Sequence, residues 1–274
     1  MGGRAVGGWD LIELLVRADD IGMAHAANEA CIEAFDQGIC RSVELMPTCP
    51  WFAEAAQLLR ERPLYDVGVH LTLTSEWERM KWGPLSRAPS LVGDDGYFYS
   101  GFGKSGEGEK NFKDAGWKLG EVEGELRAQI EKVLASVPQT SHLSSHMGLA
   151  QVDQRIGELY WQLAGEYDLV VDMTAIENFR GFGEGSGALS PSGKEAVLLQ
   201  NLEQLGPGKW LFVEHPGRDV DEMRALGHAG YCGVAMDREG VTRAWTSALV
   251  KQLIERRGIR LISYADVKAG RVER

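Results

Sequence analysis

Carboxylates and imidazoles recur at the ends of predicted strands in this 274-residue chain. Two adjacent carboxylates, Asp19 and Asp20, end the first predicted strand, and His70 lies late in the third. His146 closes the fourth strand and His215 ends the sixth. Because the carboxyl ends of parallel strands gather at one side of an α/β fold, we expect these side chains to meet although they are far apart in sequence.

One carboxylate and two neutral imidazoles form a suitable open site for one divalent metal ion. Zinc suits two imidazoles, and magnesium, manganese and cobalt are the alternatives. Such a cation acidifies a water molecule and polarises a carbonyl oxygen, so one site would serve both halves of a hydrolysis. Asp19 or Asp20 alone could merely cap the following helix, but two adjacent carboxylates repel each other unless a cation or a donor compensates.

The other histidines divide into two groups. His142 and His146 are four residues apart on one predicted strand, which places them on the same face. His70 interrupts an otherwise apolar strand. Each of these alone would be interpreted as structural, but their convergence at strand ends favours a site. His25 and His228 lack such a setting and are expected at the surface or in loops.

Short apolar runs alternate with segments of helical periodicity along the chain. The predicted strands cover residues 11–17, 42–46, 67–73, 142–146, 169–173, 210–214 and 259–263. The predicted helices cover residues 26–37, 52–61, 121–135, 151–164 and 243–257. This alternation predicts a single α/β domain folded as a distorted TIM-like (β/α) barrel with about seven parallel strands, and a doubly wound open sheet is the alternative.

We expect residues 1–10 to be an N-terminal tail and residues 11–274 to form the domain. Two stretches interrupt the alternation: residues 79–116, rich in Gly and aromatic residues, and residues 178–194, rich in Gly and Ser. Loops of this length usually have a function, so they are expected to form a lid or the walls of a substrate cleft. A flexible insertion without a role is the alternative.

The composition excludes several classes of partner. With 29 basic and 40 acidic residues, the net charge is −11, which repels nucleic-acid phosphates and anionic membranes. The sequence contains neither the run of roughly 18 apolar residues that a membrane helix needs nor a signal peptide. We therefore expect a cytoplasmic protein with no nucleic-acid or membrane partner, and its four cysteines, which form no CxxC pair, are expected to be reduced.

Four sequence blocks carry a family resemblance: Arg-Ala-Asp-Asp-Ile-Gly at 17–22, Gly-Val-His-Leu-Thr-Leu at 68–73, His-Leu-Ser-Ser-His at 142–146 and His-Pro-Gly at 215–217. In this order they resemble the YdjC/ChbG carbohydrate deacetylase family over about residues 11–267. The resemblance implies a distorted TIM-like barrel that removes acetyl groups from N-acetylglucosamine-containing di- or oligosaccharides. It also implies a cytoplasmic enzyme, often a homodimer.

By position within each block, the resemblance implies that Asp20, His70 and His146 are the metal ligands. It implies Asp19 as the general base and His215 as the candidate acid near the leaving group. The expected reaction is therefore metal-dependent hydrolysis of the acetamide bond of a small carbohydrate.

Substrate contacts are predicted at His142, Arg180 and Trp82. Trp82 and its aromatic neighbours in the first long loop could stack on sugar faces or pack within the loop. One departure concerns substrate positioning: where the family usually has a further histidine two residues after His146, this chain has Gly148.

Two other functions are compatible with the same residues. Asp and His ligands also serve metallohydrolases that act on a phosphoester or a cyclic amide. A catalytically silent sugar-binding protein on the same fold is the second alternative, although the complete set of proposed ligands and Asp19 argue against it.

Overall fold

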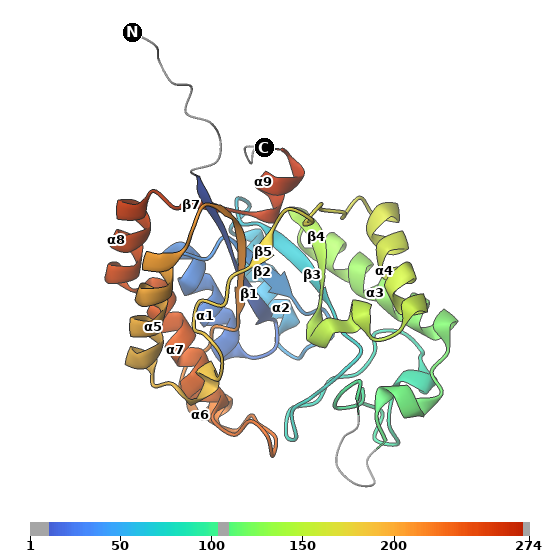
Figure 1. The fold of residues 1–274 in the computed structure, drawn as a ribbon. Coiled ribbons are helices and arrows are strands. Elements are labelled where there is room, and N and C mark those ends of the chain that lie inside the picture. The colour runs from blue at the N-terminus through green and yellow to red at the C-terminus, as the bar shows by residue number, and fades with distance from the viewer. Residues whose placement is uncertain (1–10, 104–109, 271–274) are drawn as a thin grey trace.

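Parallel strands form the centre of the protein in a computed structural model that describes residues 11–103 and 110–270 (Figure 1). In the described residues one seven-stranded sheet has the order β4-β3-β2-β1-β6-β5, and β7 pairs with β1. The strands are β1 (Ile12–Ile21), β2 (Ser42–Leu45), β3 (Val67–Leu71), β4 (Thr140–Ser145), β5 (Glu177–Asn178), β6 (Gly208–Glu214) and β7 (Arg260–Ile262). The sheet curls into a half-barrel, so the predicted distorted TIM-like barrel is confirmed.

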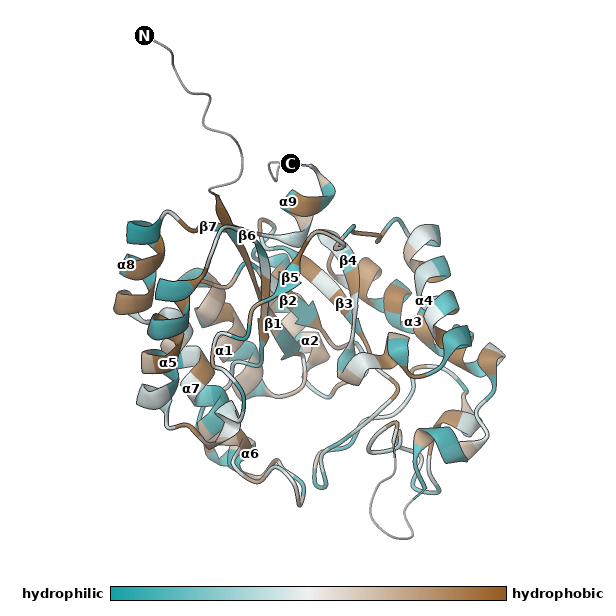
Figure 2. Cartoon of the chain, in the orientation of Figure 1, coloured by the Kyte–Doolittle hydropathy of each residue, from teal (hydrophilic) through white to brown (hydrophobic). Residues whose placement is uncertain are grey.

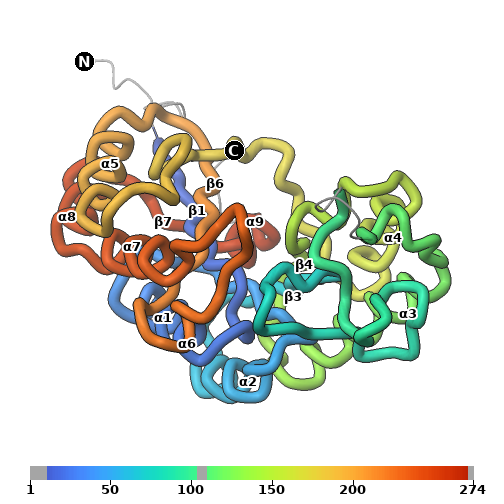
Figure 3. Tube along the Cα trace, turned by 90° about the horizontal axis from the view of Figure 1, so that it is seen from below, coloured from blue at the N-terminus to red at the C-terminus, as the bar shows by residue number. Residues whose placement is uncertain are grey.

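Helices surround these strands, and the mostly irregular chain between α4 and α5, yellow in Figure 3, crosses the remaining side. The helices are α1 (His25–Asp36), α2 (Phe52–Arg60), α3 (Leu119–Ser136), α4 (Gln154–Glu166), α5 (Pro191–Gln204), α6 (Asp221–Arg224), α7 (Val234–Thr246), α8 (Ala248–Arg257) and α9 (Tyr264–Lys268). Short 3-10 helices are η1 (Pro89–Leu91), η2 (Phe112–Ala115), η3 (His146–Gln151) and η4 (Ser186–Ala188).

The core lies between the strands and the inner faces of the helices, as the brown segments of Figure 2 show. Leu14 and Val16 of β1 have no exposed surface, as expected for a parallel strand that is covered on both sides. The helix predicted at residues 26–37 is confirmed as α1, and its Ala27, Ala30 and Ala34 are also fully buried. Their small side chains allow α1 to pack closely against the sheet.

The predicted strand at residues 169–173 is wrong, because this segment forms no strand. Leu169 donates its backbone N–H to Ala164 at the end of α4, and its carbonyl accepts one bond from Leu143 of β4. Further along, the Asp172 carboxylate accepts the backbone N–H of Thr174 at 3.0 Å, which turns the chain. Pairing with β6 begins only at β5, so the barrel is not closed by strand pairing between β4 and β5.

One helix prediction also needs correction, and one long helix was missed. The single helix predicted at residues 243–257 is two helices, since Ser247 leaves the helical conformation and its hydroxyl caps the first turn of α8. Helix α5 was not predicted and begins inside the loop expected at 178–194. Ser190 caps it and Pro191 occupies its first turn, which is a start signal that the sequence does contain.

The first long segment is irregular as predicted: the described part of residues 79–116 contains only η1 and η2. Residues 104–109 of this segment and the predicted tail at 1–10 lie outside the described residues. All four cysteines are free. Among the helices of the described part of the chain, none has the length and apolar character needed to cross a membrane.

Candidate metal centre

Asp19 and Asp20 lie at an irregularity near the end of β1. The register between β1 and β2 shifts between Ala18 and Ile21, and Asp20 has a left-handed φ of 71°. Consecutive residues of a regular strand point to opposite faces, whereas a bulge re-aims a side chain. Both carboxylates consequently reach the same imidazole: His70 Nε2 is 3.7 Å from Asp19 Oδ2 and 3.7 Å from Asp20 Oδ1.

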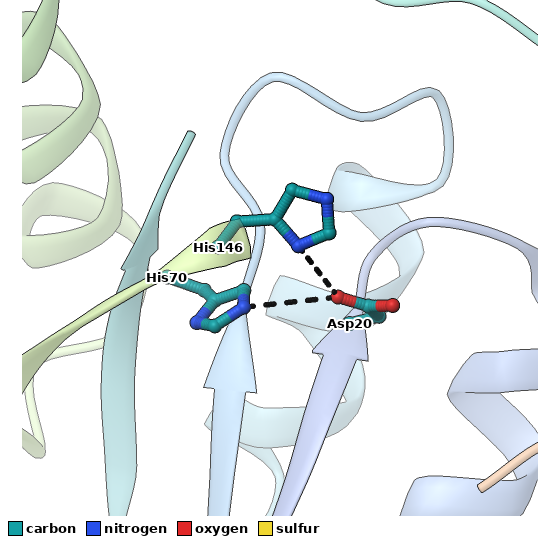
Figure 4. Close-up of side chains that lie close together, drawn as sticks. All are labelled: Asp20, His70 and His146. Carbon is teal, nitrogen blue, oxygen red and sulfur yellow. Dashed lines mark ion pairs between the residues drawn. The ribbon is translucent and has the colours of Figure 1, made fainter. Parts of the chain in front are cut away.

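Three buried side chains from separate elements converge on one point (Figure 4). They are Asp20 of β1, His70 of β3 and His146, the first residue after β4, and one donor atom of each lies within 4.8 Å of the other two. His146 Nδ1 is 3.3 Å from Asp20 Oδ1. Donor atoms that each lie about 2 Å from a tetrahedral zinc ion are about 3.3 Å apart, so the spacing suits such an ion.

The hydrogen bonding of Asp20 gives an independent test of this fit. Asp20 Oδ1, which faces both imidazoles, is buried and has no hydrogen-bond partner among the described residues. A buried carboxylate oxygen that accepts no hydrogen bond is costly, and a cation in this position would remove that cost. The three side chains therefore fit a divalent metal ion in chemistry, spacing and unsatisfied bonding.

Comparisons with known proteins assign this architecture to a family. The model of the YdjC-like protein family matches residues 13–256. The chain belongs to the YdjC-like family. The resemblance seen in the four sequence blocks is thereby confirmed.

Curated relatives match almost the whole chain. A carbohydrate deacetylase of Enterococcus faecalis is 27% identical over 270 residues, which cover 93% of this chain and 98% of the relative. A carbohydrate deacetylase of Geobacillus stearothermophilus is 28% identical over 262 residues, with 92% and 96% covered.

Solved structures share the fold. An Enterococcus faecalis structure, named for a proposed role in cellobiose-phosphate cleavage, has a TM-score of 0.72 and 26% identity, and the match covers 94% of this chain and 99% of that one. A peptidoglycan N-acetylglucosamine deacetylase has a TM-score of 0.51 and 10% identity, with 95% and 90% covered. At that identity the second likeness concerns the fold alone.

Two charged residues, which were not predicted from the sequence, contact the candidate ligands of this YdjC-like protein on the side away from the metal site. Glu76, in the segment after β3, places Oε2 3.0 Å from His146 Nε2. Arg238 of α7 donates from Nη2 to Asp20 Oδ2 at 2.9 Å. A carboxylate behind a ligating imidazole fixes its orientation and makes it a stronger ligand. No sequence signal marked Arg238, which is 218 positions from its partner.

The electrostatics of the cluster keep Asp20 charged. Burial alone would raise the pKa of Asp20, but His215, Arg238 and His146 together hold it well below its usual value. Burial, followed by the nearby His146, lowers the pKa of His70 to about 3, so His70 is a neutral imidazole with a free lone pair. Burial also acts to lower the pKa of His146, but in the absence of a cation Glu76 and Asp20 raise it.

Asp19 is held differently from Asp20. Arg17 donates from Nε to Asp19 Oδ1 at 2.7 Å and from Nη2 to Oδ2 at 2.8 Å, a two-point contact that fixes the plane of the carboxylate. Burial raises the pKa of Asp19, although Arg17 opposes the shift. The result is an oriented carboxylate with increased basicity at the edge of the cluster.

His215 lies on the open side of the cluster, directly after β6. Its Nε2 is 3.9 Å from Asp20 Oδ2, and its side chain keeps 40% of its surface exposed. Partial burial lowers the pKa of this imidazole, while Asp20 acts in the opposite direction. His215 is therefore the member of the group that meets both solvent and the other side chains.

The residues predicted to contact substrate lie in three different settings. Trp82 is 2% exposed, donates from Nε1 to the Thr74 carbonyl at 2.7 Å and approaches the His146 ring edge-on at 6.5 Å. His142 is buried inside the half-barrel, with Nε2 2.7 Å from Glu44 Oε1. Arg180 pairs with Glu184 in the exposed turn after β5. Of the three, Trp82 is the one in ring contact with the cluster.

The departure at Gly148 has a local structural basis. Met147 and Gly148 in η3 both have left-handed backbones, with φ values of 50° and 71°. A left-handed conformation favours glycine and strains most larger residues. A histidine at position 148 would therefore carry backbone strain in the conformation that this chain has, although Met147 adopts a similar one.

Proposed function

We propose that this YdjC-like protein is a metal-dependent carbohydrate deacetylase that hydrolyses the acetamide bond of N-acetylglucosamine-containing di- or oligosaccharides. The observation that carries the proposal is the buried cluster of Asp20, His70 and His146, with an Asp20 oxygen that faces both imidazoles and accepts no hydrogen bond. The curated relatives that match almost the whole chain are named carbohydrate deacetylases, which supports the same reaction.

Asp20, His70 and His146 would hold one divalent ion, and zinc suits the two nitrogen donors best. When bound, the ion supplies Lewis acidity for water activation and for the amide carbonyl. Asp19 lies beside the cluster, 3.7 Å from His70 Nε2, and cannot rotate freely because Arg17 holds both of its oxygens. Its raised pKa suits a general base that accepts the proton of the attacking water.

The departing amine needs a proton, and in this proposal His215 supplies it. It reaches Asp20 from the end of β6 and approaches Oδ2, whereas His70 and His146 approach Oδ1. Its exposed surface gives it access to both substrate and solvent protons. In this proposal Asp19 is the general base and His215 is the general acid, and the two residues lie at the ends of different strands.

The decisive experiment is acetate release from a panel of N-acetylglucosamine mono- and disaccharides. Metal-loaded wild-type protein is compared with an EDTA-treated sample and with His146→Ala, and His25→Ala serves as a matched histidine control outside the cluster. Acetate formed by the wild type and the control but lost in the other two samples is the expected result. Stoichiometric bound metal without acetate from any sugar would overturn the proposal in favour of another metallohydrolase or a silent sugar-binding protein.

A further inference from the structure

A second buried carboxylate lies within the half-barrel and has no place in the mechanism above. Glu44 of β2 has no exposed surface. Its Oε1 is 2.7 Å from His142 Nε2 and accepts the Ser42 hydroxyl at 3.3 Å. Its Oε2 accepts a short hydrogen bond from the Ser144 hydroxyl. A buried carboxylate with this many partners is fixed in one orientation.

The glycine at position 68 leaves space for the Glu44 carboxylate. Gly68 of β3 lies against Glu44 and His142: a Cβ built there would be 2.1 Å from Glu44 Oε2 and 2.5 Å from His142 Nε2. Both distances are far inside van der Waals contact. The absence of a side chain at residue 68 is thus a condition for the Glu44 and His142 pair.

Ser144 connects this interior pair to the candidate metal centre. Its Oγ is 2.7 Å from His70 Nδ1, on the side of the ring opposite the nitrogen that faces Asp20. Glu44 is ionised, because His142 and Arg17 outweigh the effect of burial and lower its pKa to about 2. The Ser144 hydroxyl faces two groups that only accept, the ionised Glu44 carboxylate in a short contact and the Val69 carbonyl at 3.4 Å, so its single proton points to the nearer one, Glu44.

The direction of that hydroxyl decides the tautomer of His70. Ser144 Oγ, having given its proton to Glu44, can only accept from His70 Nδ1. The His70 proton is therefore on Nδ1, and the lone pair is on Nε2, the atom that faces Asp20 and Asp19. In this way the charge on Glu44 determines which His70 nitrogen is available to a metal.

We propose that Ser144 and Glu44 are positioning residues that fix His70 in the tautomer and orientation that bind metal, and that His142 supports Glu44 and does not contact substrate. The inference rests on the metal site of the proposed function. His142 is held in turn: its ring stacks on Tyr264 at 3.8 Å, and its Nδ1 is 2.8 Å from the Ser141 hydroxyl. The support thus extends from the metal centre to the far end of the half-barrel.

The test measures metal binding directly, so that it does not depend on finding the substrate. Zn²⁺ affinity is measured by chelator competition, and the visible absorption spectrum is recorded for Co²⁺-loaded protein. The variants are Ser144→Ala, which breaks the contact to His70, and Glu44→Gln, which removes the charge. The matched control is Ser145→Ala, the same change one residue along β4, where the hydroxyl makes no hydrogen bond among the described residues. Thermal unfolding of the metal-free proteins reports any general loss of stability.

Ser144→Ala and Glu44→Gln are expected to bind Zn²⁺ about 10- to 100-fold more weakly than wild type, as is usual for changes behind a metal ligand. Their Co²⁺ spectra are expected to change, and those of Ser145→Ala are not. If the wild type binds metal and Ser144→Ala has the same affinity and the same spectrum, this inference is overturned and the proposed metal site is not. A wild type that bound neither ion would overturn the proposed metal site and this inference with it.

Discussion

The two imidazoles of the candidate metal centre are held by different parts of the molecule. His70 is on β3, and its far nitrogen contacts Ser144 of β4, which in turn contacts Glu44 of β2. His146 follows β4 at the start of η3, and its far nitrogen contacts Glu76 in the irregular segment after β3. One imidazole is therefore positioned by side chains of neighbouring strands, and the other by a carboxylate side chain from an irregular segment.

The part of the site around His70 forms together with the sheet, whereas the part around His146 depends on loop structure. The strand residues that support His70 are fixed by sheet pairing and by burial of at least 95% of each side chain. The support of His146 depends on a loop carboxylate and on left-handed backbone at Met147. Loops open at lower free energy than core strands, so the His146 side is expected to order last and to respond most to metal.

Removal of either imidazole is expected to have the largest effect. His70→Ala and His146→Ala each leave two of the three candidate ligands. In both variants the Zn²⁺ affinity should fall by more than about 100-fold, the upper end of the loss that is usual when a residue behind a ligand is changed. Isothermal titration calorimetry of the two variants with Zn²⁺ checks this. Retention of wild-type affinity by either variant would remove that residue from the metal site.

Asp19 lies beside His70, and its substitution is expected to give the next largest effect, a loss of turnover. Asp19→Asn keeps the shape but removes the proton acceptor, so turnover should fall about 10²- to 10⁴-fold while Zn²⁺ still binds. Steady-state acetate release together with metal titration separates the two properties. Full turnover in this variant would exclude Asp19 as the base.

The loop side is tested by Glu76→Gln. The substitution weakens the contact to His146 Nε2, and Zn²⁺ affinity should fall about 10- to 100-fold. Because Glu76 lies outside the strands, the metal-free melting temperature should change less than in Glu44→Gln. Equal losses of thermal stability in the two variants would contradict the proposed difference between the strand side and the loop side.

The smallest effect is a pH dependence on the strand side. The pKa of Glu44 is about 2 in the folded protein, below its ordinary value, because His142 and Arg17 outweigh burial. A carboxylate with a depressed pKa stabilises the fold at pH values above its pKa in the unfolded chain, about 4.3. This stabilisation is lost as the pH falls from about 4.3 towards 2. The melting-temperature difference between wild type and Glu44→Gln should therefore shrink from pH 5.5 to pH 3.5. A difference that stayed constant would contradict the ionised state of Glu44.

The sequence predicted the parts of the site that follow from strand ends. Asp20, His70 and His146 converge as expected, because the carboxyl ends of parallel strands share one side of the fold. Their order in the four blocks also identified the family. The bulge that turns both Asp19 and Asp20 inwards was not predicted, since it depends on pairing with β2.

Supporting residues could not be predicted because their partners are distant in sequence. Arg238 lies on a helix whose position relative to Asp20 is set by packing, and Glu76 lies in a segment without periodicity. The apolar run at 169–173 predicted a buried strand, and Leu169 and Val171 are indeed buried. Burial alone did not make it pair, since the turn at Asp172 diverts the backbone.

The space left at Gly68 has a consequence for how this protein can change in evolution. A methyl group at position 68 cannot coexist with the Glu44 carboxylate in its present place. A side chain at 68 therefore displaces Glu44 and His142 from their present contact, and the three positions are expected to vary together among YdjC-like sequences. A lineage that lost Glu44 would also leave His142 without its charged partner, so three positions on three neighbouring strands would evolve as one unit.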